Sequence, residues 1–78
     1  MNRAYGDAHY STASVRDNKK GCTGLELWRA RNGKQDKVAN IMFWDASGQF
    51  FVETFNADVP LSIFEEMIAE AKATIKIK

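Results

Sequence analysis

The one cysteine and the one histidine are the side chains best suited to nucleophilic or metal chemistry. Cys22 lies in the stretch Lys20-Gly21-Cys22-Thr23-Gly24, where neighbouring lysines favour a thiolate. A nucleophilic thiolate also needs a base, and His9 lies in a polar N-terminal stretch. One Cys and one His cannot complete a structural zinc site. We therefore expect no enzyme, no metal and no cofactor, and interpret Cys22 as a loop residue.

Basic and aromatic residues provide the other candidate site. Arginine and lysine neutralise phosphates, and an exposed tryptophan can stack on a base for about 1–3 kcal/mol. The sequence suggests a nucleic-acid surface around the first hairpin, made of Lys19, Lys20, Trp28, Arg29, Arg31, Lys34 and Lys37. The alternative, which we favour, is that Trp28 is buried in the core or in an interface and the charges keep the hairpin soluble.

Charge is distributed unevenly along the chain, although the net charge is only +1. Residues 1–40 hold eight basic and four acidic side chains, whereas residues 41–78 hold three and six. Such asymmetry can reflect an anionic partner, but an excess of this size is mild for a dedicated nucleic-acid domain. An ordinary mixed surface is the preferred interpretation.

Three strands and two turns are predicted in the middle of the chain. The strands cover 25–31, 38–44 and 50–55, where apolar and β-branched residues are frequent. Asn32-Gly33 suits a type I′ hairpin turn, and Asp45-Ala46-Ser47-Gly48 suits a type I turn with Gly48 left-handed. This pattern predicts an antiparallel meander.

Both faces of that meander carry apolar side chains. With a three-residue loop over 46–48, one face is expected to hold Ala39, Ile41, Phe43, Phe51 and Phe55, and the other Val38, Met42, Trp44, Phe50 and Val52. A two-residue loop would exchange the third-strand residues. One helix covers one face, so the second face needs the N-terminal segment or a second subunit. We expect a homodimer interface that includes Met42, Trp44, Phe50 and Val52.

One amphipathic helix is predicted after Pro60. Ser62 and Glu65 have the spacing of a capping box, and an apolar stripe recurs at helical spacing over Phe64, Met67, Ile68, Ala71 and Ile75. Glu66 and Glu70 are placed on the solvated side. The helix is expected to fade near Thr74, and residues 74–78 alternate like a short strand that could pair with another chain.

The N-terminal segment over residues 1–20 is predicted to be polar and mobile, with an edge strand over 10–16 as an alternative. The folded domain is then 21–78. The stretch 37–71, with Leu61-Ser62 opening the helix, resembles the dimeric transcriptional coactivator family, which binds single-stranded DNA through a curved sheet. The three strands and helix also resemble the plant ethylene-response domain, whose sheet enters the major groove. Neither resemblance includes a diagnostic motif.

The sequence thus predicts an α+β fold, with a three-stranded, or alternatively four-stranded, antiparallel meander and one C-terminal helix on one face. Small domains without disulfides often gain stability by forming oligomers. The expected function is a non-enzymatic interaction module acting as a homodimer, with nucleic-acid binding as the alternative. A single cysteine and the lack of long apolar stretches predict a reducing, cytoplasmic setting without membrane contact. No small-molecule ligand is indicated.

Overall fold

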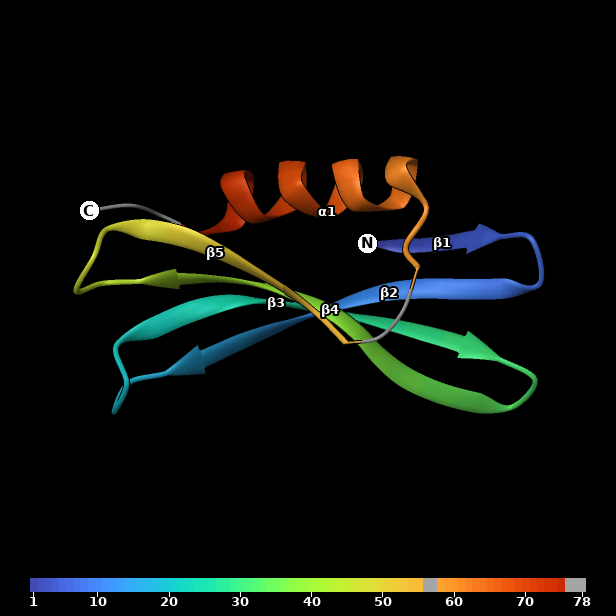
Figure 1. The fold of residues 1–78 in the computed structure, drawn as a ribbon, viewed down its shortest axis with the longest axis horizontal. Helices are drawn as coiled ribbons and strands as arrows, with labels where there is room; N and C mark the ends of the chain where they lie inside the picture. Colours follow the sequence, from blue (N-terminus) through green and yellow to red (C-terminus); the bar gives the residue numbers. More distant parts are fainter. Residues whose placement is uncertain (56–57, 76–78) are drawn as a thin grey trace.

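The computed structural model describes residues 1–55 and 58–75, which form one antiparallel sheet and one helix (Figure 1). The strands are β1 (Asn2–Tyr5), β2 (Ala8–Asp17), β3 (Cys22–Arg31), β4 (Lys34–Trp44) and β5 (Gln49–Thr54), and the helix is α1 (Leu61–Thr74). The strand order in space follows the chain, β1-β2-β3-β4-β5. The predicted α+β class with one C-terminal helix is confirmed, but the sheet has five strands, not three or four.

The two additional strands come from the segment that was predicted to be mobile. β2 pairs with β3 from His9↔Ala30 to Asp17↔Cys22, across the domain boundary predicted between residues 20 and 21. β1 pairs with β2 in turn, and Gly6 turns the chain between them at φ 61. Residues 1–20 are therefore part of the domain. Backbone pairing holds β2 in place although much of its sequence is polar.

The first predicted turn is confirmed. Asn32 and Gly33 adopt φ 52 and φ 76, as a type I′ turn requires, and Arg31 pairs with Lys34. The second turn covers four residues, 45–48, whereas the predicted face assignment used a three-residue loop over 46–48. Gly48 is left-handed at φ 64, as predicted.

The longer second turn changes which third-strand residues share a face. Phe43 pairs with Phe50, and Ile41 with Val52. Cross-strand partners project to the same face. Phe50 and Val52 therefore lie on the α1 side, while Phe51 joins Met42 on the other side. The predicted grouping of Met42 and Trp44 with Phe50 and Val52 on one face is wrong.

A β-bulge in β4 corrects a second assignment. Trp28 pairs with Lys37 and Leu27 with Ala39, so Val38 is the extra residue. Val38 and Ala39 are both buried in the same core cluster, although strict alternation predicted opposite faces. A bulge re-aims a side chain in this way.

The core lies between α1 and one face of the sheet. Ile63, Met67, Ala71 and Ile75 are buried in the same cluster as sheet residues that include Tyr10, Leu25, Leu27, Ala39, Ile41 and Phe43. Ile63 was missing from the predicted stripe, while Phe64 and Ile68 are only partly buried. Among the described residues, no helix lies over the opposite face of the sheet (Figure 1).

The helix ends differ in how well the sequence predicted them. The end at Thr74 is confirmed, whereas residues 76–78 of the proposed terminal strand lie outside the described residues. The predicted capping box is wrong, because α1 begins at Leu61 with Pro60 as N-cap and no side chain of residues 1–55 or 58–75 caps it. Ser62 is thus inside the first turn.

Two glutamates on α1 tie the helix to the N-terminal strands. Glu66 accepts from the Arg3 guanidinium at 2.7 Å, and Glu70 accepts from the Thr12 hydroxyl at 2.9 and 3.0 Å. These two glutamates were predicted to lie on a solvated face. They instead hold α1 over β1, which was not predicted, and over β2, which contains the alternative strand predicted over 10–16.

Candidate interaction surface

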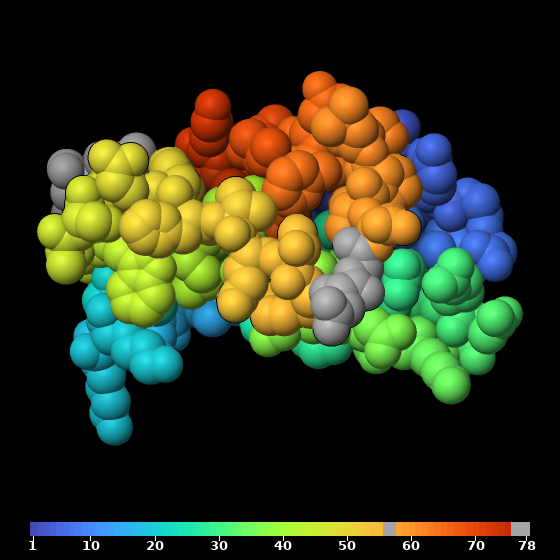
Figure 2. Space-filling view, in the orientation of Figure 1, coloured from blue at the N-terminus to red at the C-terminus, as the bar shows by residue number. Residues whose placement is uncertain are grey.

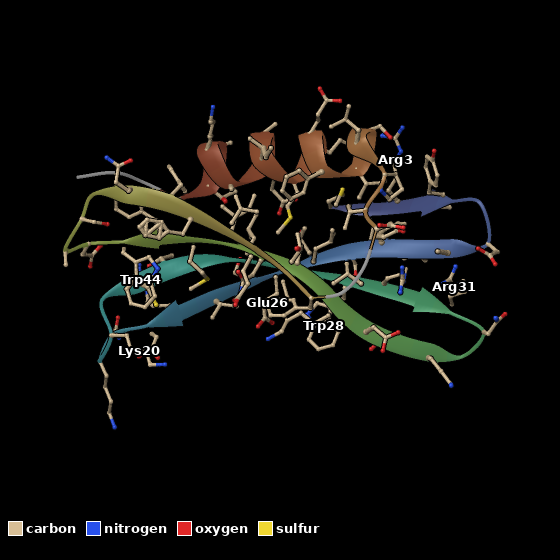
Figure 3. All side chains as sticks on the ribbon, in the orientation of Figure 1. Arg3, Lys20, Glu26, Trp28, Arg31 and Trp44 are labelled. Atoms are coloured by element: carbon tan, nitrogen blue, oxygen red, sulfur yellow. The ribbon has the colours of Figure 1, made fainter. Side chains whose placement is uncertain are left out.

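The sheet face opposite α1, here called the open face, displays side chains from all five strands. Val15, Gly24, Met42 and Phe51 form one row across it, since each pairs with the next in register. Trp44 lies one step along β4 from Met42, across from Cys22. Figure 3 shows Trp44, Trp28 and Glu26 on the side of the sheet away from the helix.

One end of the open face is apolar. Val15, Met42 and Trp44 are half-buried, and Phe51 is 48% exposed. These four residues are called the open-face patch. Gly24 makes the patch continuous, because it leaves room for the Met42 side chain. A methyl group at its α-carbon would lie only 2.5 Å from the Met42 sulfur. The Met42 side chain therefore lies over the glycine, and no helix within the described part of the chain covers it.

The middle of the open face is polar and mostly acidic. The Trp28 indole donates to Glu26 Oε1 at 3.3 Å, and Lys37 Nζ donates to Glu26 Oε2 at 3.1 Å. The same ammonium lies 5.3 Å from the centre of the Phe55 ring. Asn40 donates to Glu53 at 3.5 Å. Glu26 thus holds both Trp28 and Lys37 in place. This pair is the part of the open face that most resembles a basic-aromatic site.

The structure separates the residues of the predicted nucleic-acid surface. Lys19 and Lys20 lie in the β2–β3 turn, at the opposite end of β3 from Lys34. Lys20 and Arg31 lie at opposite ends of the sheet in Figure 3. Arg29 and Arg31 lie on the α1 side, whereas Trp28 lies on the open face. Trp28 and Lys37 are brought together as partners across β3 and β4, and Arg29 and Arg31 line one pocket on the α1 side.

A shallow pocket of about 590 Å³ contains the two hairpin arginines. It lies between the β1–β2 turn and the segment before α1, and its lining is Tyr5, Gly6, Asp7, Ala8, Tyr10, Arg29, Arg31, Asp58, Val59 and Pro60. Arg31 lies 4.0 Å from Asp7. Two carboxylates balance the two guanidinium groups, so the pocket has no net charge to select an anion. The sequence missed it because half of its lining comes from the segment that was predicted to be mobile.

The candidate catalytic residues are far apart. Cys22 is buried at the start of β3, not exposed in a loop, and is a free thiol. His9 pairs with Ala30 near the other end of β3 and contacts Asn2 at 2.9 Å. A strand rises about 3.3 Å per residue, so roughly 25 Å separates the two. Within residues 1–55 and 58–75, no three His, Cys, Asp or Glu side chains are placed to share a metal ion.

Comparison with known proteins adds no relative. No family model, curated protein or solved structure matches this chain. Among the described residues, no helix has the length and apolar character needed to cross a membrane.

Proposed function

We propose that this protein is a small non-enzymatic interaction module that acts as a homodimer. The observation that carries the proposal is the apolar surface at the β5 side of the sheet. Phe51 on the open face and Val52 on the α1 side are 48% and 53% exposed. Phe51 belongs to the open-face patch with Val15, Met42 and Trp44, and contiguous exposed apolar patches mark interaction sites. A domain of this size also has little core with which to offset the entropy of folding.

A second copy of the chain is the proposed partner. The four residues expected in the interface, Met42, Trp44, Phe50 and Val52, point to different faces, but all lie in β4 and β5, at one side of the sheet. An interface along that side can include residues of both faces. The interaction-module reading is also supported by the wide separation of Cys22 and His9, the candidate nucleophile and base.

Light scattering across the micromolar range tests the homodimer. The expected mass is twice the 8.8 kDa of one chain. Phe51→Asp should weaken association by a factor of ten or more, which corresponds to about 1.4 kcal/mol. Gln49→Asp is the matched control, because it adds the same charge to the same face of β5 at an exposed site. A parent chain that stays monomeric throughout would overturn the proposal.

Nucleic-acid binding is the second candidate. Its support is the pairing of Trp28 with Lys37 on an uncovered sheet, although Glu26 and Glu53 place negative charge beside them. Titration with a short single-stranded oligonucleotide should then quench tryptophan fluorescence, less at higher salt. Lys37→Glu should abolish that quenching, and Lys20→Glu, at the far turn, should not. No quenching at low salt rules this candidate out.

A reducing compartment is the proposed setting. The only cysteine is a buried free thiol, so it offers no disulfide within the chain. Equal unfolding midpoints with and without a thiol reductant are expected for such a protein. A reductant-sensitive midpoint would count against this setting.

A further inference from the structure

The two edges of the sheet are built differently. β1 has four residues and carries Arg3, which is paired with Glu66 on α1. β5 has six residues, Gln-Phe-Phe-Val-Glu-Thr, with a single charge and no proline. Short strands and charged residues protect sheet edges against further pairing. β1 has such protection. Among residues 1–55 and 58–75, β5 is the edge open to an additional strand, and it lies at the front of the molecule in Figure 2.

Both faces of β5 lack cover from the described chain. Phe51 on the open face is 48% exposed, and Val52 on the α1 side is 53% exposed. A chain packed on either face of the sheet would cover only one of these side chains. A strand added beside β5 would flank both at once, because strands lie about 4.8 Å apart and their side chains alternate between faces. The exposure pattern therefore favours an edge-on partner.

The hydrogen-bonding groups that β5 turns outward follow from its pairing with β4. The Phe55 amide donates to the Val38 carbonyl at 3.0 Å, beside the pair Ala39↔Thr54. Bonded and non-bonded pairs alternate in an antiparallel ladder. Glu53 and Phe51 therefore direct their backbone groups at β4. Phe50, Val52 and Thr54 direct theirs away from the sheet.

We infer that β5 pairs antiparallel with β5 of a second copy, with Val52 opposite the second copy's Val52. This geometry rests on the proposed homodimer and specifies its interface. In this register Phe50 lies opposite the second copy's Thr54, so every outward amide and carbonyl of the three residues gains a partner. On the open face, Phe51 lies opposite the second copy's Glu53.

Other two-fold registers pair fewer of the outward backbone amides and carbonyls of β5, or place like charges opposite each other. Centring the pair on Glu53 puts two carboxylates directly opposite each other, which destabilises a cross-strand pair. Centring it on Phe51 leaves the outward groups of Thr54 beyond the partner strand, beside the turn at Gly48. The Val52 register avoids both defects. It joins two sheets into one, with both α1 helices on the same side and the two open-face patches continuous.

Cysteine cross-linking tests the register. Val52→Cys, in a Cys22→Ala background, should form a disulfide-linked dimer, because a bonded antiparallel pair places its α-carbons about 5.5 Å apart. Thr54→Cys in the same background is the control. It lies on the same face of β5, but roughly 14 Å from its counterpart, given a rise of about 3.3 Å per residue. Circular dichroism of both reduced variants confirms that the sheet is intact.

The outcomes separate this inference from the proposed homodimer. A dimer by light scattering, with efficient linkage at position 52 and little at 54, supports both. A dimer without linkage at 52, or with equal linkage at 54, overturns the β5 register and leaves the homodimer standing. A monomeric mass for the parent chain overturns both.

A proline substitution provides a second test without a cysteine. Val52→Pro removes an amide that points away from β4, so the intramolecular ladder keeps its bonds. The variant should weaken dimerisation at least tenfold while keeping the circular dichroism of the fold. Val52→Thr, which retains the amide and a β-branched side chain, should dimerise like the parent. Equal association of the proline variant and the parent would overturn the inference.

Discussion

Gly24 leaves the space on the open face that the Met42 side chain occupies. It lies in the row Val15, Gly24, Met42 and Phe51, with neighbours on both adjacent strands. A methyl group there would meet both the Ile41 carbonyl oxygen and the Met42 sulfur. Glycine is therefore required for space, and this allows the Met42 side chain to lie across the strand. The continuity of the open-face patch depends on this one missing side chain.

Gly24→Ala is expected to destabilise the fold by about 1–3 kcal/mol, the usual cost of overpacking. Urea unfolding followed by circular dichroism measures the change. Ser14→Ala, at an exposed position of the neighbouring β2, is the control and should stay within about 0.5 kcal/mol of the parent. If Gly24→Ala were as stable as the parent, Met42 could not lie over Gly24 as described.

At the scale of elements, α1 is held to the sheet mainly by packing. Met67 is fully buried at 0% exposure, whereas Leu61 on the same helix is 72% exposed. Met67→Ala should lower the free energy of unfolding by about 2–5 kcal/mol, because it removes buried methylenes and leaves a cavity. Leu61→Ala should change it by less than about 0.5 kcal/mol. Urea titrations of both variants decide this, and equal losses would mean that α1 packs through another face.

The elements differ in how well the sequence predicts them. β3, β4 and β5 were predicted because Asn32-Gly33 marks their first turn and apolar residues recur in each. β2 was predicted only as the alternative edge strand over 10–16, because Ser11, Thr12 and Ser14 place small polar groups on both faces and its pairing depends on the backbone. Residue identity also gave no sign of the bulge at Val38. That bulge and the length of the 45–48 turn decide which side chains share a face.

The candidate site also depends on strand pairing that residue identity does not reveal. Met42, Trp44, Phe50 and Val52 all lie in β4 and β5, but the pairing register decides which face each side chain takes. The basic residues were grouped by their closeness in sequence. A strand of ten residues separates Lys20 from Lys34 in space, and alternation separates Trp28 from Arg29. Spacing along a chain does not reveal either separation.

The proposed β5 register makes a charge-specific prediction. Position 51 lies opposite Glu53 of the second copy, so Phe51→Lys gains an opposite charge and Phe51→Asp gains a like charge. Each cross-strand charge pair contributes roughly 0.2–1 kcal/mol, and the two-fold axis doubles it. Phe51→Lys should therefore dimerise several-fold more tightly than Phe51→Asp. Both variants lose the same ring, and repeating the comparison in a Glu53→Lys background isolates the charge from the difference in side-chain length.

Adding Glu53→Lys to each variant should reverse that order. Sedimentation equilibrium at low salt measures the four dissociation constants, since salt screens exposed charge pairs. An order that stays the same after Glu53→Lys would place some residue other than Glu53 opposite position 51.

For the whole molecule, folding and association are expected to be one equilibrium. A partner that binds only the folded chain stabilises it by mass action, so the unfolding temperature rises with protein concentration. A tenfold increase in concentration adds about 1.4 kcal/mol per dimer, which corresponds to a rise on the order of a few degrees. Thermal scans followed by circular dichroism over a hundredfold range should show this rise for the parent chain.

The Val52→Pro variant separates the contribution of association from that of the fold. Its backbone change lies on the outer side of β5, so at high dilution it should melt at nearly the same temperature as the parent. Its unfolding temperature should not depend on concentration, because the partner strand no longer has a bonded site. The two curves are therefore expected to meet at low concentration and diverge at high concentration. Parallel curves with a constant offset would mean that Val52→Pro weakens the monomer itself and that the β5 edge contributes nothing to association.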